Sequence, residues 1–374
     1  MSPSHPVQLS FSMRGWCQRC VGYEICGAQQ TECHAFQTHP NEVLNPDHPE
    51  LLSWLAQIRG LRFDDVVARP LPGPGLPAYV PVIEGRGSAY VDAGVLDHVA
   101  VTLADVFSEC RLVPVSAAGI RAKLRLPAST RITLLGVGRD RLIERMWGEQ
   151  SRVFEAIAAL EFDLVTAFNY SIWYDQPRME HLVNLKRSLL TFERLQSLGV
   201  PVVPHVYWYN RVDLRRWADW LCANPVPAIA LNLQTGRSQS VWKRLLDGLQ
   251  WIGERFPKDL QYLVIGPSTY ERMSSVLFHL RRVTFCNKDA YVMACKRQIK
   301  TWHGTEFGAV QCNEGPPDIF RHNAGLFSRV ASGDPPPPFA ILDGFGKSGA
   351  VQARLPGMST LKDEQLAELP LLAA

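Results

Sequence analysis

Short apolar runs alternate with longer amphipathic stretches along the chain between residues 78 and 300. The short runs are rich in β-branched and aromatic residues, which favour strands, while the longer stretches repeat their apolar residues with helical spacing. Strands are predicted at 78–85, 98–107, 131–140, 162–171, 200–210, 227–236, 260–268 and 281–288. Helices are predicted at 141–160, 178–198, 213–223, 239–255, 270–280 and 289–300.

This alternation predicts parallel strands joined by right-handed helical crossovers, and therefore an α/β fold. Eight expected strands favour a (β/α)8 TIM-like barrel, and a doubly wound open sheet is the alternative. The barrel is expected over 78–345. A helix and a linker with five prolines in RPLPGPGLPAYVP are expected over 46–77, and a tail over 346–374.

Composition changes this picture little. The 374 residues are 46% hydrophobic and 20% charged, which suits a globular protein with a large core, and the net charge is only +3. No apolar run approaches the ~20 residues that span a bilayer, so no membrane partner is expected. Residues 1–15 lack the pattern of a secretory signal. A cytoplasmic location follows as the expectation, and disulfides are uncommon there.

The segment WCQRCVGYEICGAQQTEC predicts a metal-binding module over residues 1–45. A pair of cysteines two residues apart can place both sulfurs on one ion, and a second pair nearby can complete a tetrahedral site. Zinc and an iron–sulfur cluster both accept four thiolates. Apolar neighbours of the cysteines favour a shielded iron–sulfur cluster; zinc, or reduced cysteines without metal, are the alternatives. The expected ligands are Cys17, Cys20, Cys26 and Cys33.

Polar side chains follow several expected strands, and the carboxyl ends of parallel strands are where barrel enzymes hold their active sites. Asn169, Asn232 and Gln234 carry donors and acceptors that suit the edge of a planar polar ligand such as a nucleobase. Ser171 stands close to Asn169. Trp208, with Tyr207 and Tyr209 beside it, can stack on such a ring.

Two residues are candidates for catalysis. Asp175 lies in the loop NYSIWYDQP directly after a strand, among aromatic residues that can raise its pKa. Its alternative role is capping of the helix that follows Pro177. His205 lies within the apolar run VPHVYW, and it is either a buried core histidine or a residue that binds substrate or transfers a proton.

Basic residues gather in the span 270–300, which includes Arg281 and Arg282. If such residues share one rim, that face attracts phosphate groups, and nucleic acid becomes the expected partner. Solvated helix faces are the alternative explanation.

The run FNYSIWYDQPRMEHLVNLKRSLLTFERLQSLGVPVVPHVYW, with the later YLVIGPS, resembles an uncharacterised family from bacteria, phages and mobile elements. The resemblance covers about 160–270 and implies no activity. More loosely, the pattern looks like the barrel of the transglycosylases that exchange guanine for a deazaguanine in tRNA or DNA. In those enzymes an aspartate attacks the sugar carbon, and here Asp175 corresponds to that nucleophile. The zinc cysteines of that family lie downstream of the barrel, whereas the cysteines here precede it.

These observations lead to the hypothesis of a barrel enzyme that acts on nucleic acid or a nucleobase-like ligand by base exchange or glycosidic-bond chemistry. Asp175 is the expected nucleophile or base, with the amide side chains reading the base. One alternative is a noncatalytic nucleic-acid-binding or assembly subunit of a mobile-element or defence system, in which the cysteines organise an interface with protein partners. The other is a hydrolase of small sugars or phosphoesters.

Overall fold

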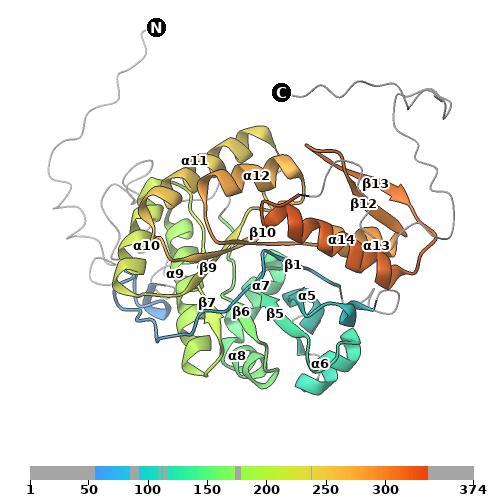
Figure 1. Cartoon of the computed structure of the whole chain (residues 1–374). Coiled ribbons are helices and arrows are strands. Elements are labelled where there is room, and N and C mark those ends of the chain that lie inside the picture. Colours follow the sequence, from blue (N-terminus) through green and yellow to red (C-terminus); the bar gives the residue numbers. More distant parts are fainter. Residues whose placement is uncertain are drawn as a thin grey trace, which may run out of the picture.

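Parallel strands and helices alternate along the chain in the computed structural model of the protein. The structure describes residues 55–84, 92–108, 111–112, 116–172, 178–236 and 238–335. Figure 1 shows helices on all sides of a central group of strands. The predicted α/β class with parallel strands is confirmed, and most of the predicted strands and helices are found close to their expected positions.

The central strands form two parallel sheets. The first has the order β1-β11-β10-β9-β8, with β1 (Tyr79–Pro81), β11 (Val283–Asn287), β10 (Gln261–Ile265), β9 (Ala228–Asn232) and β8 (His205–Val206). The second has the order β2-β5-β6-β7, with β2 (His98–Thr102), β5 (Arg131–Leu135), β6 (Leu164–Thr166) and β7 (Val202–Val203). Two antiparallel pairs complete the strands: β3 (Phe107–Ser108) with β4 (Arg111–Leu112), and β12 (Gln298–Trp302) with β13 (Phe307–Gln311).

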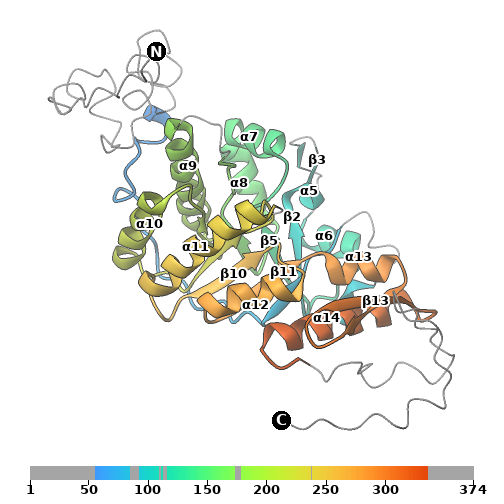
Figure 2. The ribbon, with the colours of Figure 1, turned by 90° about the horizontal axis from the view of Figure 1, so that it is seen from above.

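The helices connect and cover these strands. They are α5 (Leu103–Val106), α6 (Ala117–Leu124), α7 (Asp140–Gly148), α8 (Gln150–Ala159), α9 (Arg178–Ser197), α10 (Arg211–Ala223), α11 (Gln239–Arg255), α12 (Tyr270–His279), α13 (Asp289–Cys295) and α14 (Pro316–Ala331), with a 3-10 turn η2 (Ala93–Val95). Figure 2 shows the β12–β13 hairpin at the periphery beside α13 and α14. Capping side chains begin several helices: Asn210 accepts from the backbone N–H groups of α10, and Ser238 does so for α11. No helix in the described ranges is long and apolar enough to cross a membrane. The cytoplasmic location stays a prediction.

Most predicted strands are shorter than expected, the strand predicted at 200–210 is two short strands, and the helix predicted at 141–160 is two helices, α7 and α8. Two early ends have a clear local cause. The strand predicted at 98–107 ends at Thr102, because Thr102 and Asp105 form a capping box that starts the short helix α5. The helix predicted at 289–300 ends at Cys295, and Arg297 then adopts a positive φ of 55° at the turn into β12. Both changes come from local turn chemistry that apolar periodicity does not report.

The two parallel sheets touch at two places. Only Pro204 separates β7 from β8, and its carbonyl accepts a hydrogen bond of 2.9 Å from the Ala230 N–H of β9. Val82, just after β1, pairs in parallel with Ala100 of β2. The regular ladders are interrupted at both junctions, so the described strands form two sheets rather than one continuous ladder.

Side chains alternate between two buried clusters along the strands, as the twofold period of a strand requires. In β9, Ile229 and Leu231 face the helices, whereas Ala228 and Ala230 belong to a second, inner cluster. This inner cluster draws side chains from both sheets: Val80, Val82, Ala100, Leu135, Leu164, Val203, Ala228, Ala230, Leu263, Ile265 and Cys286, with Val137 just after β5.

The predicted proline-rich linker packs against the amino ends of the strands. Arg131 opens β5 and donates to the Pro74 carbonyl at 2.7 Å, and Gln261 opens β10 and donates to the Leu76 carbonyl at 3.0 Å. The Leu76 side chain joins the inner cluster. The described part of this segment therefore belongs to the packed structure, because its carbonyls satisfy side chains from both sheets.

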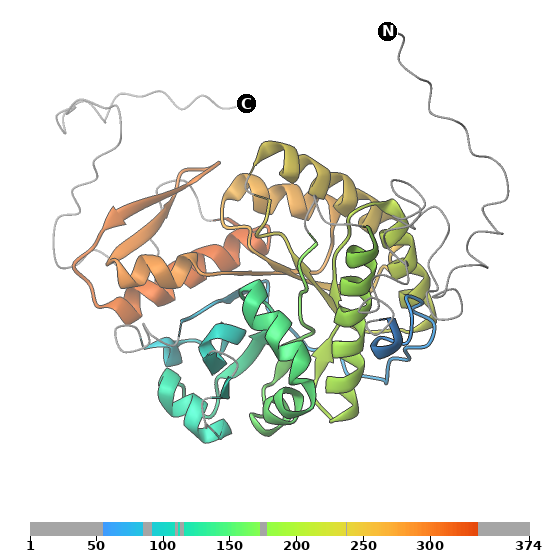
Figure 3. The ribbon, with the colours of Figure 1, turned by 180° about the vertical axis from the view of Figure 1, so that it is seen from behind.

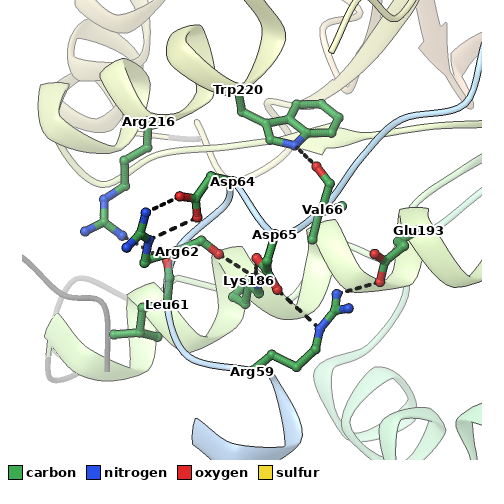
Figure 4. Close-up of polar contacts among 10 residues, drawn as sticks. All are labelled: Arg59, Leu61, Arg62, Asp64, Asp65, Val66, Lys186, Glu193, Arg216 and Trp220. Carbon is green, nitrogen blue, oxygen red and sulfur yellow. Dashed lines mark hydrogen bonds and ion pairs between the residues drawn. The ribbon is translucent and has the colours of Figure 1, made fainter. Parts of the chain in front are cut away.

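Residues 61–69, which we call the strap, run along helices α9 and α10 (Figures 3 and 4). The fully buried Lys186 of α9 donates to the Arg62 carbonyl and forms an ion pair with Asp65. Trp220 of α10 donates its indole N–H to the Val66 carbonyl at 2.8 Å. Arg59, just before the strap, bridges Asp65 and Glu193 of α9 at 3.2 and 2.6 Å. Burial lowers the pKa of Lys186, and the Asp65 carboxylate opposes that effect.

Candidate functional site

The carboxyl ends of β5, β6, β8 and β9 bring together most of the polar side chains that the sequence singles out. Asn169 follows β6, and its backbone N–H donates to the Gly136 carbonyl at the end of β5 at 2.8 Å. Asn232 closes β9, and its side-chain oxygen accepts from the Gln234 N–H at 3.1 Å. Both amide side chains are partly exposed. Parallel strands from both sheets therefore deliver these groups to the same end of the fold.

Gly136 allows β5 and β6 to approach closely at this end. A Cβ atom at position 136 would lie 2.2 Å from the Ala167 carbonyl oxygen. The Gly136 N–H instead donates to the Thr166 hydroxyl at 2.8 Å. A glycine is required here because the neighbouring backbone leaves no room for a side chain.

His205 is fully buried in β8, and its environment determines its protonation state. Its Nδ1 lies 3.2 Å from the Ala167 carbonyl oxygen, which requires the proton to be on Nδ1. Its Nε2 is then an acceptor, and Nε2 has no hydrogen-bond partner among the described residues. Burial lowers the pKa of His205 to about 4, so the imidazole is neutral at physiological pH. His205 is thus suited to accept a hydrogen bond.

Ser171 belongs to a small hydrogen-bonded group just after strand β6. Its hydroxyl donates to the Asp140 carboxylate at 2.5 Å, and Asp140 begins helix α7. The Ser171 carbonyl accepts from the Asn184 side chain of α9 at 2.8 Å. These bonds tie the loop after β6 to two helices on either side of it.

Arg187 of α9 is a buried positive charge near this end. Its guanidinium donates to Glu144 of α7 at 2.9 Å and lies 5.1 Å from the ring centre of Trp147. It also lies 5.6 Å from the ring of Tyr170, which follows β6. The Glu144 side chain is 49% exposed, so the buried Arg187 guanidinium is paired with a carboxylate that reaches the surface. Burial raises the pKa of Glu180, and the nearby negative charge of Glu144 adds to this increase.

Tyr207 follows β8 and lies beside this charged group. Burial raises the pKa of its phenol well above the usual value; Tyr170, Asp213 and Glu144 add to the increase, and Arg187 opposes it. The ring centres of Tyr207 and His205 are 6.3 Å apart, with the rings nearly perpendicular. The Tyr207 hydroxyl is buried and has no hydrogen-bond partner in the part of the chain that the structure describes.

Two predicted ligand-binding residues have other surroundings. The indole of Trp208 packs against Gly248 of α11, where an added Cβ atom would lie 2.3 Å from it. Gln234 is exposed, and its backbone supports the turn that Asn232 caps. Trp208 is therefore held by helix packing on at least one face.

Arg281 and Arg282 lie at the opposite end of the fold. They precede β11, at the amino end of that strand, and both are exposed. Arg282 donates to the Asp259 carbonyl. The structure therefore does not bring them to one rim with Asn169, Asn232 and His205, because the carboxyl ends of parallel strands point away from these arginines.

The remaining predicted residues lie outside the described residues. These are Asp175 and the four cysteines Cys17, Cys20, Cys26 and Cys33. Within the described ranges no group of three or more histidine, cysteine, aspartate and glutamate side chains is arranged to hold a metal ion. The loop that contains Asp175 is bounded by Ile172 and Arg178, so it joins the carboxyl end of β6 to the first turn of α9.

Sequence reasoning missed Arg187 and Glu144, and it considered Tyr207 only for stacking. The available signal was the sequence HLVNLKRSLL, in which Asn184 and Arg187 stand among the apolar residues of a predicted helix. Polar residues at such positions face the core and need buried partners, as they do here. The partner of Arg187 comes from α7, which apolar periodicity cannot identify.

Comparisons with known proteins found no match, neither among protein-family models nor among curated proteins.

Proposed function

We propose that this chain is a (β/α)8-barrel enzyme that acts on nucleic acid or on a nucleobase-like ligand. The barrel itself is part of the proposal. Support comes from the two junctions between the sheets, at Pro204–Ala230 and at Val82–Ala100, and from the inner cluster that combines side chains of both sheets. Taking β7 and β8 as one strand interrupted at Pro204, the two sheets supply eight parallel strands around that cluster.

The observation that carries the proposed function is the buried, neutral His205 with an unpartnered Nε2 among the described residues. Buried polar atoms almost always have partners, and each exception calls for an explanation such as a catalytic role or an ordered water. His205 begins β8 and pairs with Ala230 of β9, and the partly exposed Asn169 and Asn232 lie at or just beyond the carboxyl ends of β6 and β9. Together these groups supply the donors and acceptors that a planar, hydrogen-bonding ring requires.

The proposed reaction is base exchange with Asp175 as nucleophile. Its carboxylate attacks the sugar carbon that holds the base, and the bond from that carbon to the base nitrogen breaks. The electron pair stays on the departing base, which takes up a proton. An incoming base then attacks the same carbon, releases Asp175 and gives up the equivalent proton. His205 holds the base through Nε2, a role that suits its lowered pKa better than proton transfer.

This proposal is tested by incubating the full-length protein with radiolabelled guanine and either tRNA or duplex DNA. We expect label to enter one of them, and Asp175→Asn to reduce the rate by at least about a thousandfold, because the nucleophile is lost. The matched control is Asp219→Asn, at an exposed position of α10. A rate that Asp175→Asn leaves unchanged would exclude this mechanism.

A second candidate function is noncatalytic nucleic-acid binding. It is favoured by the exposed Arg281 and Arg282, which lie just beyond the 83% exposed Phe278 at the end of α12. Arginines that contact phosphates and an exposed aromatic ring that stacks on bases are typical of single-strand binding surfaces. Binding that survives Asp175→Asn, is lost on charge reversal of both arginines, and comes without base exchange would favour this function.

We also propose that the amino-terminal cysteines hold an iron–sulfur cluster or zinc. The support is the donor set, because four thiolates with one closely spaced pair suit either group. Iron, zinc and acid-labile sulfide are measured on protein purified without oxygen, beside a Cys17→Ser variant. We expect one of the two metals at about one site per chain and its loss in the variant. Protein that contains neither metal would contradict the proposal.

A further inference from the structure

We infer that Tyr207 binds the ligand of the proposed site, and that its hydroxyl acts together with His205 Nε2. The pair recognises a ligand edge that presents a hydrogen-bond acceptor beside a donor. The inference rests on the proposed function in placing the ligand at the carboxyl ends of the strands. It goes further by assigning a role to Tyr207 and a chemical requirement to the ligand.

The first observation is the contrast between Tyr207 and three other buried tyrosines. Tyr79 donates to the Asn287 side chain at 3.0 Å, and Tyr291 donates to the Glu84 carbonyl at 3.1 Å. Tyr170 lies 3.5 Å from the Thr191 hydroxyl. The Tyr207 hydroxyl is equally buried, yet no described residue pairs with it. A buried hydroxyl without a partner costs free energy, so another group is expected to complete it.

The second observation is that two unpartnered buried atoms of opposite character belong to neighbouring rings. Tyr207 keeps its proton at physiological pH, so its hydroxyl is available as a donor. His205 Nε2 carries no proton, so it is an acceptor. The centres of the two rings are 6.3 Å apart and the rings are nearly perpendicular, so the two residues are neighbours in the fold.

The third observation is the charge behind Tyr207. The Arg187 guanidinium acts electrostatically on the Tyr207 phenol and lowers the energy of negative charge there. A ligand oxygen that accepts a hydrogen bond from Tyr207 therefore also experiences this positive charge. Two kinds of ligand edge meet the requirement. One is a lactam, with its carbonyl facing Tyr207 and its N–H facing His205, and the other is a sugar hydroxyl that accepts from Tyr207 and donates to His205.

Calorimetric titration of the full-length protein separates these sources with three compounds. Hypoxanthine carries the lactam edge, purine riboside carries sugar hydroxyls without a lactam, and 9-methylpurine carries neither and has no N–H or O–H donor. We expect hypoxanthine or purine riboside to bind, and Tyr207→Phe to weaken that compound about tenfold, because one buried hydrogen bond is lost. 9-Methylpurine should show no dependence on Tyr207.

A thermal-unfolding comparison separates ligand binding from a structural role. Tyr207→Phe should leave the melting temperature unchanged or raise it, because it removes an unpaired hydroxyl. Tyr79→Phe is the matched control and should lower the melting temperature, because its hydroxyl is bonded to Asn287. Equal losses of stability in both variants, with ligand affinity unchanged, would overturn the inference.

The other outcomes are also decisive. Failure of both hypoxanthine and purine riboside to bind the unmodified protein overturns the inference. Tyr207-dependent binding without base exchange leaves the inference standing and refutes the proposed reaction alone. Base exchange at the full rate in Tyr207→Phe refutes the inference and leaves the proposed function intact.

Discussion

Replacing Asp65 with alanine is expected to lower the free energy of unfolding by about 3 kcal/mol, because it leaves the ammonium of Lys186 buried without its counter-charge. The Lys186 side chain is 0% exposed, and its remaining partner in the strap is the Arg62 carbonyl. An isolated buried charge is much more costly than a missing surface pair. The same substitution also removes the ion pair between Arg59 and Asp65, so that Arg59 keeps only its ion pair with Glu193.

The adjacent residue provides the control for this prediction. Asp64 pairs with Arg62, but both side chains are largely exposed, at 58% and 69%. Asp64→Ala should therefore leave the unfolding midpoint within experimental error, because water replaces an exposed ion pair at little cost. Urea unfolding followed by far-UV circular dichroism measures all three proteins. Equal midpoints for Asp64→Ala and Asp65→Ala would show that Lys186 does not hold the strap to α9.

Acidification from pH 7 to pH 4 is expected to remove about 3 kcal/mol of stability through His205 alone. In the unfolded chain a histidine takes up its proton near pH 6.5, whereas in the folded protein the pKa of His205 is about 4. Between these values the unfolded state binds the proton and the folded state does not, so falling pH favours unfolding. The difference of about 2.5 pKa units, at about 1.4 kcal/mol per unit, gives this magnitude. The contribution is complete above pH 6.5 and is lost as the pH falls toward 4.

The His205→Asn variant isolates this effect. It should be less stable than the unmodified protein at pH 7, since asparagine does not fill the same volume, but its stability should fall less between pH 6.5 and pH 4. His98 at the start of β2 acts in the same direction, because burial lowers its pKa to about 4 as well. In the double variant with His98→Asn, stability should depend even less on pH over this range. Parallel pH profiles for the single variant and the unmodified protein would contradict the assigned environment of His205.

Much of the local structure could be predicted because its signals are local. The strand 283–287 and the helix that precedes it follow from runs of apolar residues with periods near two and 3.6. The placement of Asn169 and Asn232 at one end of the fold also follows from sequence, since Asn232 ends a parallel strand and Asn169 follows another within three residues. The same rule could have placed Arg281 and Arg282 at the opposite end, because they precede their strand. The basic residues of 270–300 were considered together, and this hid the fact that Arg281 and Arg282 precede a strand rather than follow one.

The properties of individual site residues could not be predicted in the same way. Whether His205 or Tyr207 has a hydrogen-bond partner depends on atoms from other elements, such as the Ala167 carbonyl at the end of β6. Trp208 looked free to stack on a ligand, yet Gly248 of α11 provides the surface on which it packs. A strand residue alternates between two faces, but only the assembled fold determines what each face meets.

Spacing between neighbouring residues was enough to predict the order of the central strands, the helices between them and the parallel α/β class, but not α5, α6, α14 or the two antiparallel pairs. Which charges are buried, and with which partners, follows only from the packing of the whole chain. Lys186 shows why: its counter-charge Asp65 stands 121 positions earlier in the chain, and nothing in the spacing between them marks the pair. The two meet only because the strap packs along α9, and that packing depends on long-range contacts that no local pattern encodes.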